Sequence, residues 1–299
     1  MRARLPFVVS AVFHYLGPAF AVLLFARVDV LGVAWLRIAS AALVFALWRR
    51  PWHVLRHRTV LAWGLVLAVM NCCFYTAIDR LPLATVAAIE FLPVIALAAL
   101  GARSPRNAVA LALAVPGVYL LTGVHLEGEP LGVALAFANA GLFAAYIVLA
   151  HRVASDPAIS GIDGLAGAMI VALVAVTPVA GWAALPALAD PVALAAGVGV
   201  GVSSSVIPYI ADQVAMARLS RAAYALMVSL LPATATVIGL IVLTQVPSAT
   251  DAAGIALVIA GVALHREPTP PPAAPPSPPP RPSAAARPIP VASGSRGRP

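Results

Sequence analysis

Residues 82–101 read PLATVAAIEFLPVIALAALG, an apolar run with one charged side chain, Glu90. A helix needs about 20 predominantly apolar residues to cross the hydrocarbon core of a bilayer. Comparable runs follow one another from residue 6 to residue 265, and we predict spans at residues 6–26, 30–48, 59–78, 82–101, 107–124, 130–150, 164–185, 192–213, 222–244 and 249–265. The expected fold is therefore an all-α integral membrane protein with ten transmembrane helices.

The composition of the whole chain supports this class. Hydrophobic residues make up 62% of the 299 residues, charged residues make up only 10%, and the mean hydropathy is +0.96. A typical soluble domain is about half apolar and about one quarter charged. An ordinary water-soluble core is thus excluded.

The arginines predict the orientation in the membrane. All 19 basic residues are arginines, and all but three lie in alternate loops or near the two ends of the chain. The exceptions are Arg27 and Arg80 in the opposite loops and Arg37 within a span. Because cytoplasmic loops retain positive charge, we expect a multi-pass protein of the bacterial inner (plasma) membrane with both termini cytoplasmic. The net charge of +8 then reflects topology, and no nucleic-acid partner is expected.

The end of the chain differs in composition from the spans. Residues 267–299 consist mainly of Pro, Ala, Ser and Arg and have too little apolar content to bury a core. We expect a disordered cytoplasmic tail with polyproline II character. Docking of residues 275–282 in an aromatic groove of a partner is the alternative.

The two halves of the chain show internal similarity. Arg80-Leu81-Pro82-Leu83-Ala84-Thr85 opens the fourth span, and Arg218-Leu219-Ser220-Arg221-Ala222-Ala223 opens the ninth. A proline follows each opening about a dozen residues later, Pro93 in the fourth span and Pro232 in the ninth. The pattern indicates five spans, duplicated.

A duplication of five spans has a topological consequence. Because five is odd, the two copies insert with opposite orientation, so residues 6–124 and 130–266 are predicted to form two inverted five-helix repeats. Such repeats are typical of transporters that work by alternating access. A proline-interrupted helix exposes backbone groups only where protein or a cavity satisfies them, so Pro93, Pro232 and also Pro208 mark the expected helix breaks near the substrate.

Two stretches carry a resemblance to a known family. The first runs from Ala77-Ile78-Asp79-Arg80-Leu81-Pro82-Leu83 to Ala88-Ile89-Glu90-Phe91-Leu92-Pro93, and the second from Val206-Ile207-Pro208-Tyr209-Ile210-Ala211-Asp212-Gln213 to Leu230-Leu231-Pro232-Ala233-Thr234. Here the chain resembles the ten-span EamA exporters of the drug/metabolite transporter superfamily, in the threonine and homoserine exporter (RhtA-like) branch, over about residues 6–266.

The resemblance implies the efflux of small metabolites. Amino acids such as threonine or homoserine, or related amines, are the leading substrate class, and proton exchange is the implied driving force. The chain departs from the family pattern Glu-Phe-Leu-Gly-Pro at one place, because Leu92 is followed directly by Pro93. The missing residue rotates whatever follows by about 100° on the helix.

Two ionisable side chains, Arg37 and Glu90, lie deep in predicted spans. Counted from the outer starts of the second and fourth spans, both lie roughly 10 to 12 Å deep at 1.5 Å per residue, so we expect that they can meet. As a functional pair, Glu90 would bind a substrate ammonium or a proton while Arg37 holds the substrate carboxylate. The alternative is a structural ion pair that locks two helices.

Histidine and tyrosine side chains add further candidates. His14 and Tyr15 precede Gly17-Pro18, a predicted kink in the first span, which makes His14 a candidate proton carrier; a neutral packing histidine is the alternative. Asp212 closes the eighth span after Tyr209 and is a candidate gate. A surface pair between Asp212 and an arginine of the following loop is the alternative.

Other polar side chains within the spans are expected to line the cavity, because lipid would penalise them if they faced outward. They are Asn71, Asn139, Tyr146 and Ser203-Ser204-Ser205. Hydrogen bonding between helices explains them nearly as well.

The sequence disfavours catalysis and cofactors. A serine hydrolase needs a histidine beside its nucleophile, and of the six histidines only His14 is well inside a span. Gly197-Val198-Gly199-Val200-Gly201 follows no strand, and Cys72-Cys73 has neither metal nor redox spacing. We predict a secondary transporter without cofactor or metal, with a small-molecule substrate, protons and the lipid bilayer as partners; a homodimer is left open. A receptor or assembly factor, or an intramembrane hydrolase, is the alternative.

Overall fold

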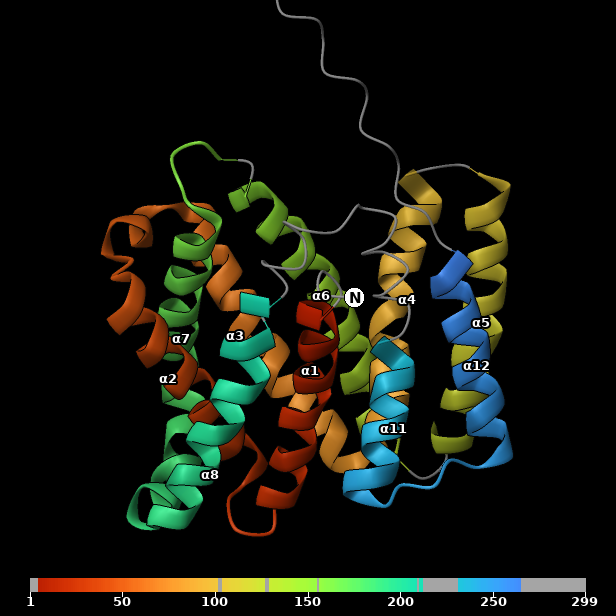
Figure 1. The fold of residues 1–299 in the computed structure, drawn as a ribbon. Helices are drawn as coiled ribbons and strands as arrows, with labels where there is room; N and C mark the ends of the chain where they lie inside the picture. Colours follow the sequence, from red (N-terminus) through yellow and green to blue (C-terminus); the bar gives the residue numbers. More distant parts are fainter. Residues whose placement is uncertain are drawn as a thin grey trace, which may run out of the picture. The chain divides into compact units, whose positions relative to one another are not determined.

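The structure is a computed structural model that describes residues 5–101, 104–126, 129–154, 156–208, 210–211 and 231–264. Helices make up its regular structure there, and no strand occurs in these ranges. The helices are α1 (Leu5–Leu24), α2 (Val30–Arg49), η1 (Trp52–Arg56), α3 (Arg58–Arg80), α4 (Leu83–Gly101), α5 (Pro105–Leu126), α6 (Pro130–Ala154), α7 (Gly161–Ala189), α8 (Pro191–Gly201), η2 (Val202–Val206), α11 (Leu231–Leu243) and α12 (Ala249–Leu264) (Figure 1).

The predicted spans and the helices agree closely. Ten α-helices occupy the described ranges, one in each predicted span, so the all-helical fold is confirmed. By length and composition, four of them are long and apolar enough to cross a membrane, namely α2, α3, α7 and the Pro130–Ala150 part of α6. The ninth span is described only from residue 231, and the predicted tail, residues 267–299, lies outside the described residues.

The surface of the helical unit fits a lipid environment. Trp182, Tyr119 and Ile241 are each more than 70% exposed, and many further large apolar side chains are about half exposed. A shallow groove between α3 and α7 is lined only by apolar residues, among them Leu61, Leu65 and Val174. Apolar side chains on the outside are expected where lipid, rather than water, surrounds the helices.

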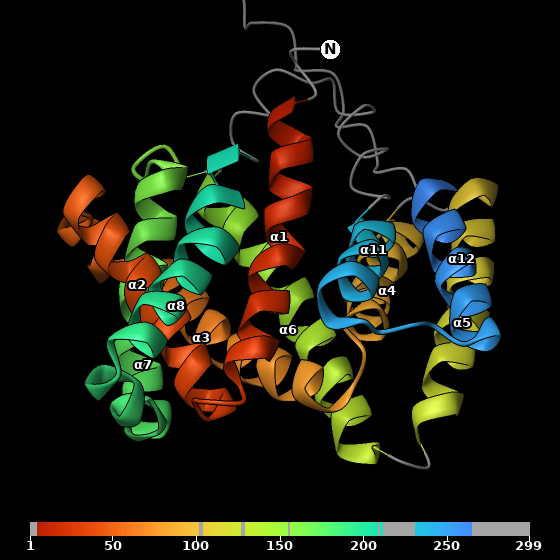
Figure 2. The same ribbon diagram turned by 60° about the horizontal axis from the view of Figure 1, so that its bottom comes forward.

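Small residues bring α5 and α12 into close contact. A Cβ atom on Gly117 would lie 2.8 Å from the carbonyl oxygen of Gly254, and a Cβ atom on Gly254 would lie 2.8 Å from that of Gly117. Gly261 similarly faces the carbonyl of Ala110 at 2.8 Å. Figures 1 and 2 show the two helices side by side. Backbones approach this closely in membranes only where side chains are small.

An ion pair closes each end of the α2–α7 contact. At one end Arg49 Nε lies 2.7 Å from Asp163 Oδ1, in the first turn of α7. At the other end Arg27, just before α2, has its Nη1 atom 3.9 Å from Oδ2 of Asp190, the residue that follows α7. The middle is tight as well, because a Cβ atom on Gly32 would overlap the backbone of Ala183.

Helix α1 has a central place within the helical unit. Figures 1 and 2 both show it between α2, α7 and α8 on one side and α4, α11, α5 and α12 on the other. It contacts α3, α8, η2 and α11. Gly17 permits the approach to η2, because a Cβ atom there would overlap the side chain of Ser204. Buried polar side chains converge on this region.

Candidate functional site

Arg37 is held by uncharged partners from two other helices. Helix α2 begins at the N-cap Asp29, whose carboxylate accepts a hydrogen bond from Leu31 N. Two turns later, Arg37 Nη1 donates to Asn71 Oδ1 at 2.7 Å, and Nε donates to Ser205 Oγ at 3.0 Å. The guanidinium carbon lies 5.5 Å from the ring centre of Tyr75. No carboxylate of the described residues forms an ion pair with Arg37.

The third contact of Arg37 follows from a proline. Pro208 has no backbone N–H, so the carbonyl of Ser204 lacks the donor that an α-helix would supply four residues later. Residues 202–206 form the π-helix η2, with a bond from Ile207 N to Val202 O, and the Ser204 carbonyl accepts from Arg37 Nη2 at 3.4 Å. The structure therefore has one wide turn just before Pro208. Such turns are frequent at functional sites.

Glu90 has a different partner, Asn139 on α6. Asn139 Nδ2 donates to Glu90 Oε1 at 3.1 Å, and the two side chains are 0% and 6% exposed respectively. Glu90 has no ion-pair partner among the residues that the structure describes. Arg37 lies close enough to act electrostatically on both Glu90 and His14. Arg37 and Glu90 therefore lie in one region but do not form the direct ion pair that their similar depths in the predicted spans suggested.

The reason for this difference is geometric. Depth along two helices places Arg37 and Glu90 at similar heights, but it fixes neither the rotation of each helix nor which neighbour it faces. Asn71 and Ser205 each accept a hydrogen bond from Arg37, while Asn139 donates one to Glu90. A structural Arg37–Glu90 lock is therefore absent from this structure.

Tyr15 and Asn139 leave buried polar atoms unmatched. The Tyr15 side chain is 0% exposed and lies within electrostatic reach of Glu90, yet its hydroxyl has no hydrogen-bond partner. Asn139 Oδ1 is also buried without a partner. Buried polar groups in native proteins are nearly always satisfied by protein, water or ligand. Two unsatisfied polar atoms thus lie near Glu90.

The remaining predicted site residues fall in different places. His14 is half-buried and meets Tyr15 edge to face at 5.3 Å between ring centres. Tyr146 lies away from Asn139 along α6, stacked on Phe143 at 5.9 Å and tilted against Trp63 at 5.5 Å. Tyr146 thus takes part in an aromatic cluster with Phe143 and Trp63.

The structure describes Pro93 and Pro232 but not the predicted gate at Asp212. Helix α4 is continuous through Pro93 as far as Gly101, and Pro232 is the second described residue of α11, where it is buried. Tyr209 and Asp212 lie outside the described residues. The gate at Asp212 therefore stays a prediction.

One residue at the site escaped sequence reasoning. Tyr75 is fully buried and lies under the Arg37 guanidinium. Its spacing is a usable signal, because side chains four residues apart share one face of a helix and Tyr75 is four residues beyond Asn71. A polar residue followed at that spacing by an aromatic one marks the face of α3 that meets Arg37.

Three comparisons relate the chain to known proteins. Residues 130–266 match the EamA-like transporter family. The chain is 30% identical over 266 residues to the threonine/homoserine exporter RhtA of Salmonella typhimurium strain LT2, covering 84% of this chain and 88% of the relative. It is 30% identical over 238 residues to RhtA of Escherichia coli strain K12, covering 77% and 79%. A crystal structure of a protein shares the fold with a TM-score of 0.58 at 19% identity, over 88% of this chain and 96% of the other.

Proposed function

The chain belongs to the EamA-like transporter family, and we propose that it is a secondary active exporter of small amino acids or related amines. It is a multi-pass membrane protein of a transporter family and not an enzyme. Threonine and homoserine lead the proposed substrates because the relatives are exporters of these two amino acids. The bacterial relatives favour the inner membrane as the location.

One observation carries the substrate class: the half-buried Arg37 and the buried Glu90 share one region without pairing. An arginine has five N–H donors, and three donor contacts of Arg37 go to neutral acceptors, so its charge remains available. Glu90 has one oxygen engaged by Asn139. A zwitterion complements this arrangement, with its carboxylate at Arg37 and its ammonium at Glu90.

The unmatched atoms suit a hydroxylated side chain. Asn139 Oδ1 is an acceptor, and the Tyr15 hydroxyl both donates and accepts. A hydroxyl on the substrate would satisfy either atom. A site that hydrogen-bonds a substrate hydroxyl discriminates against analogues that lack it, because its own polar groups are then left unpaired.

Alternating access by two inverted repeats is the proposed transport cycle. When each helix of the first half is matched with the helix five spans later, equivalent pairs of helices are in contact. The α3–α6 contact then corresponds to the η2–α1 contact, α4–α6 to α11–α1, and α3–α7 to α8–α2. The ion pairs Arg49–Asp163 and Arg27–Asp190 close opposite ends of α2–α7. These correspondences support repeats at residues 6–124 and 130–266.

The contacts of Arg37 support the same symmetry. Asn71 lies thirteen residues beyond the first residue of α3, and Ser204 lies thirteen residues beyond the first residue of α8. Arg37 therefore binds corresponding positions of the third and eighth spans. A side chain that bridges both halves can sense their relative movement, as alternation of the cavity between the two sides requires.

Proton exchange follows from the same carboxylate. Glu90 can hold either a proton or a substrate ammonium, and a cycle that exchanges one for the other avoids moving an unpaired buried charge. His14, beside Tyr15 on α1, is the second proton-carrying candidate. In this cycle the proton gradient drives export.

Counterflow in proteoliposomes tests the proposal. Vesicles loaded with unlabelled threonine are diluted into a trace of radiolabelled threonine, and the protein should produce transient accumulation of the label. Homoserine inside the vesicles should support the same accumulation, whereas 2-aminobutyrate, which lacks the hydroxyl of threonine, should support less. Absence of counterflow with amino acids and small amines across a broad panel would refute an exporter of this class.

A further inference from the structure

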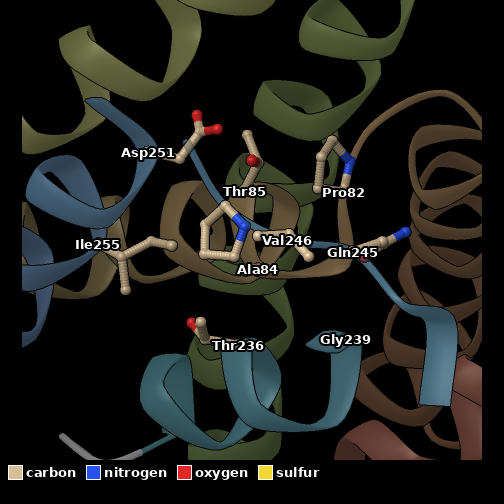
Figure 3. Close-up of a pocket in the computed structure, with 10 residues that line it drawn as sticks. Pro82, Ala84, Thr85, Thr236, Gly239, Gln245, Val246, Asp251 and Ile255 are labelled. Atoms are coloured by element: carbon tan, nitrogen blue, oxygen red, sulfur yellow. The ribbon is translucent and has the colours of Figure 1, made fainter. Parts of the chain in front are cut away.

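Two hollows in the described part of the chain lie outside the contacts of Arg37 and Glu90. The smaller, about 150 Å³, lies between α4, α11 and α12, and Figure 3 shows its lining. Asp251 in this lining forms a capping box with Ser248 at the start of α12, so a structural role accounts for it. The larger, about 400 Å³, is the groove between α3 and α7.

Small and apolar residues build this groove. Gly64 lets α3 approach α7 closely, because a Cβ atom there would lie 2.7 Å from the carbonyl oxygen of Ala168. The walls are formed by Leu55, Leu61, Leu65, Ile170, Val171, Val174 and Ala175. Leu61, Leu65 and Val174 are 40%, 53% and 69% exposed, so the groove opens on the surface of the helical unit. Its side chains offer no hydrogen bond to a polar solute, and the groove suits a hydrocarbon chain.

The face of α3 that borders the groove continues beyond it at both ends. Arg58, Leu61, Leu65 and Val69 follow one another at intervals of three or four residues, so they lie along one face of the helix. From Arg58 to Val69 this face is about 16 Å long. The hydrocarbon core of a bilayer is about 30 Å thick, so the length matches a single leaflet. One lipid molecule therefore fits along it, with its headgroup at Arg58.

The end of the groove at Arg58 is strongly cationic. Residues 49–58 contain four arginines, two histidines and no carboxylate. Asp163 Oδ1 engages Arg49 Nε at 2.7 Å, whereas Arg56 and Arg58 are exposed and form no ion pair with any residue that the structure describes. The arginine distribution assigns this end to the cytoplasm. The cytoplasmic leaflet carries anionic lipids, which arginines near the membrane surface attract.

The short helix η1 joins these charges to the groove. It packs on both α3 and α7, and its Leu55 lines the groove, directly before Arg56. Residues three apart in a 3-10 helix lie on the same side, so Trp52, which is 60% exposed, shares the side of Leu55. Tryptophan is enriched at the level of the lipid headgroups. Membrane topology alone explains arginines in this loop, but it does not explain their position at the end of an apolar groove.

We propose that the groove between α3 and α7 binds one anionic phospholipid of the cytoplasmic leaflet. An acyl chain lies along Leu61, Leu65 and Val174, and the phosphate lies at Arg56 and Arg58. Guanidinium groups bind phosphate through paired, charge-assisted hydrogen bonds. The bound lipid contacts α3 and α7 together and stabilises their packing. This site goes beyond the proposed function and does not depend on which solute is exported.

Thermal unfolding of the purified full chain in detergent tests the site. Dioleoylphosphatidylglycerol is compared with dioleoylphosphatidylcholine, which has the same acyl chains and no net charge, and with glycerol 3-phosphate, which has the phosphate but no acyl chain. A lipid that binds only the folded protein should raise the apparent melting temperature by about 2–4 °C at ten times its dissociation constant. We expect this shift with phosphatidylglycerol and not with the other two compounds.

Substitutions separate the headgroup contact from the groove. Arg58→Gln should reduce the shift with phosphatidylglycerol, and the combination with Arg56→Gln should abolish it. Arg106→Gln is the matched control, because it removes an exposed arginine from the start of α5, outside the groove, and should keep the shift. Ala175→Phe fills the groove with apolar atoms, leaves every arginine in place and should reduce the shift.

Several results would overturn the proposal. Equal shifts with phosphatidylcholine or glycerol 3-phosphate would show that the lipid is not selected by charge and chain together, and the absence of any shift would show that no lipid binds. A parental response of the double variant, or an equal loss with Arg106→Gln and Arg58→Gln, would remove the headgroup contact. A parental response of Ala175→Phe would leave a charged surface without a lipid groove.

Discussion

Glu90 is the residue on which the proposed proton exchange depends directly. Glu90→Gln preserves the shape and an acceptor for Asn139 Nδ2 and removes only the charge. A hydrogen bond to a charged group is worth about 1.5–3 kcal/mol, so we expect export to fall about 10- to 100-fold and to lose its response to a proton gradient. Uptake of labelled threonine into inverted vesicles at several imposed gradients measures both effects.

Glu129→Gln provides the matched control for that substitution. Glu129 is a surface carboxylate whose Oε2 atom lies 3.7 Å from Arg80 Nη1, and its side chain is 45% exposed. The same chemical change there should leave the rate and its pH dependence as in the parent. Parental transport by Glu90→Gln would make Glu90 structural and would contradict the exchange mechanism.

Arg37 should matter for both stability and binding. Arg37→Ala leaves Asn71 Oδ1 and the Ser204 carbonyl without their donor in a buried place, and each unsatisfied group costs about 1–3 kcal/mol. We expect a clear fall in the melting temperature. Arg37→Lys keeps the charge but cannot serve three acceptors in fixed directions, so it should fold better than alanine and bind substrate more weakly than the parent.

Arg27→Ala is the comparison for Arg37→Ala. Arg27 has a 62% exposed side chain and only a 3.9 Å contact with Asp190, and surface ion pairs contribute about 1 kcal/mol or less. Thermal unfolding of both variants should therefore separate them clearly. Equal melting temperatures would show that the contacts of Arg37 do not stabilise the fold.

At the scale of helices, the α5–α12 contact is the place where a small change should have a large effect. Gly254→Val places side-chain atoms against the Gly117 carbonyl, which leaves no room for them. Overpacking of this kind typically costs about 1–3 kcal/mol. We expect a lower melting temperature and less folded protein in the membrane fraction.

Gly199→Val controls for the helix propensity of valine. A Cβ atom on Gly199, in α8, would meet nothing within 4 Å, so the same substitution there adds no clash. Its effect should be limited to the propensity difference between glycine and valine, which is a few tenths of a kcal/mol in favour of valine. If both variants unfold at the same temperature, α5 and α12 do not pack as the structure describes.

At the scale of the whole molecule, the helices were predictable because the length of an apolar run is visible directly in the sequence. The sequence also indicated Arg37 and Glu90, since ionisable residues within spans are rare and usually functional. Their partners were not predictable in the same way, because Asn71, Ser205 and Asn139 depend on helix rotation and on which helices are neighbours.

Membrane orientation is a property of the whole molecule that labelling of introduced cysteines tests. The arginine distribution places η1 in the cytoplasm and the end of α3 outside. In a background with Cys72→Ala and Cys73→Ala, we expect Arg56→Cys to resist an impermeant maleimide in intact cells and to react after permeabilisation. Asp79→Cys, at the opposite end of α3, should react from outside without permeabilisation. Because the two ends of one helix lie on opposite sides, the reverse pattern would show that the topology is inverted. Labelling of both positions from outside would contradict a single orientation altogether.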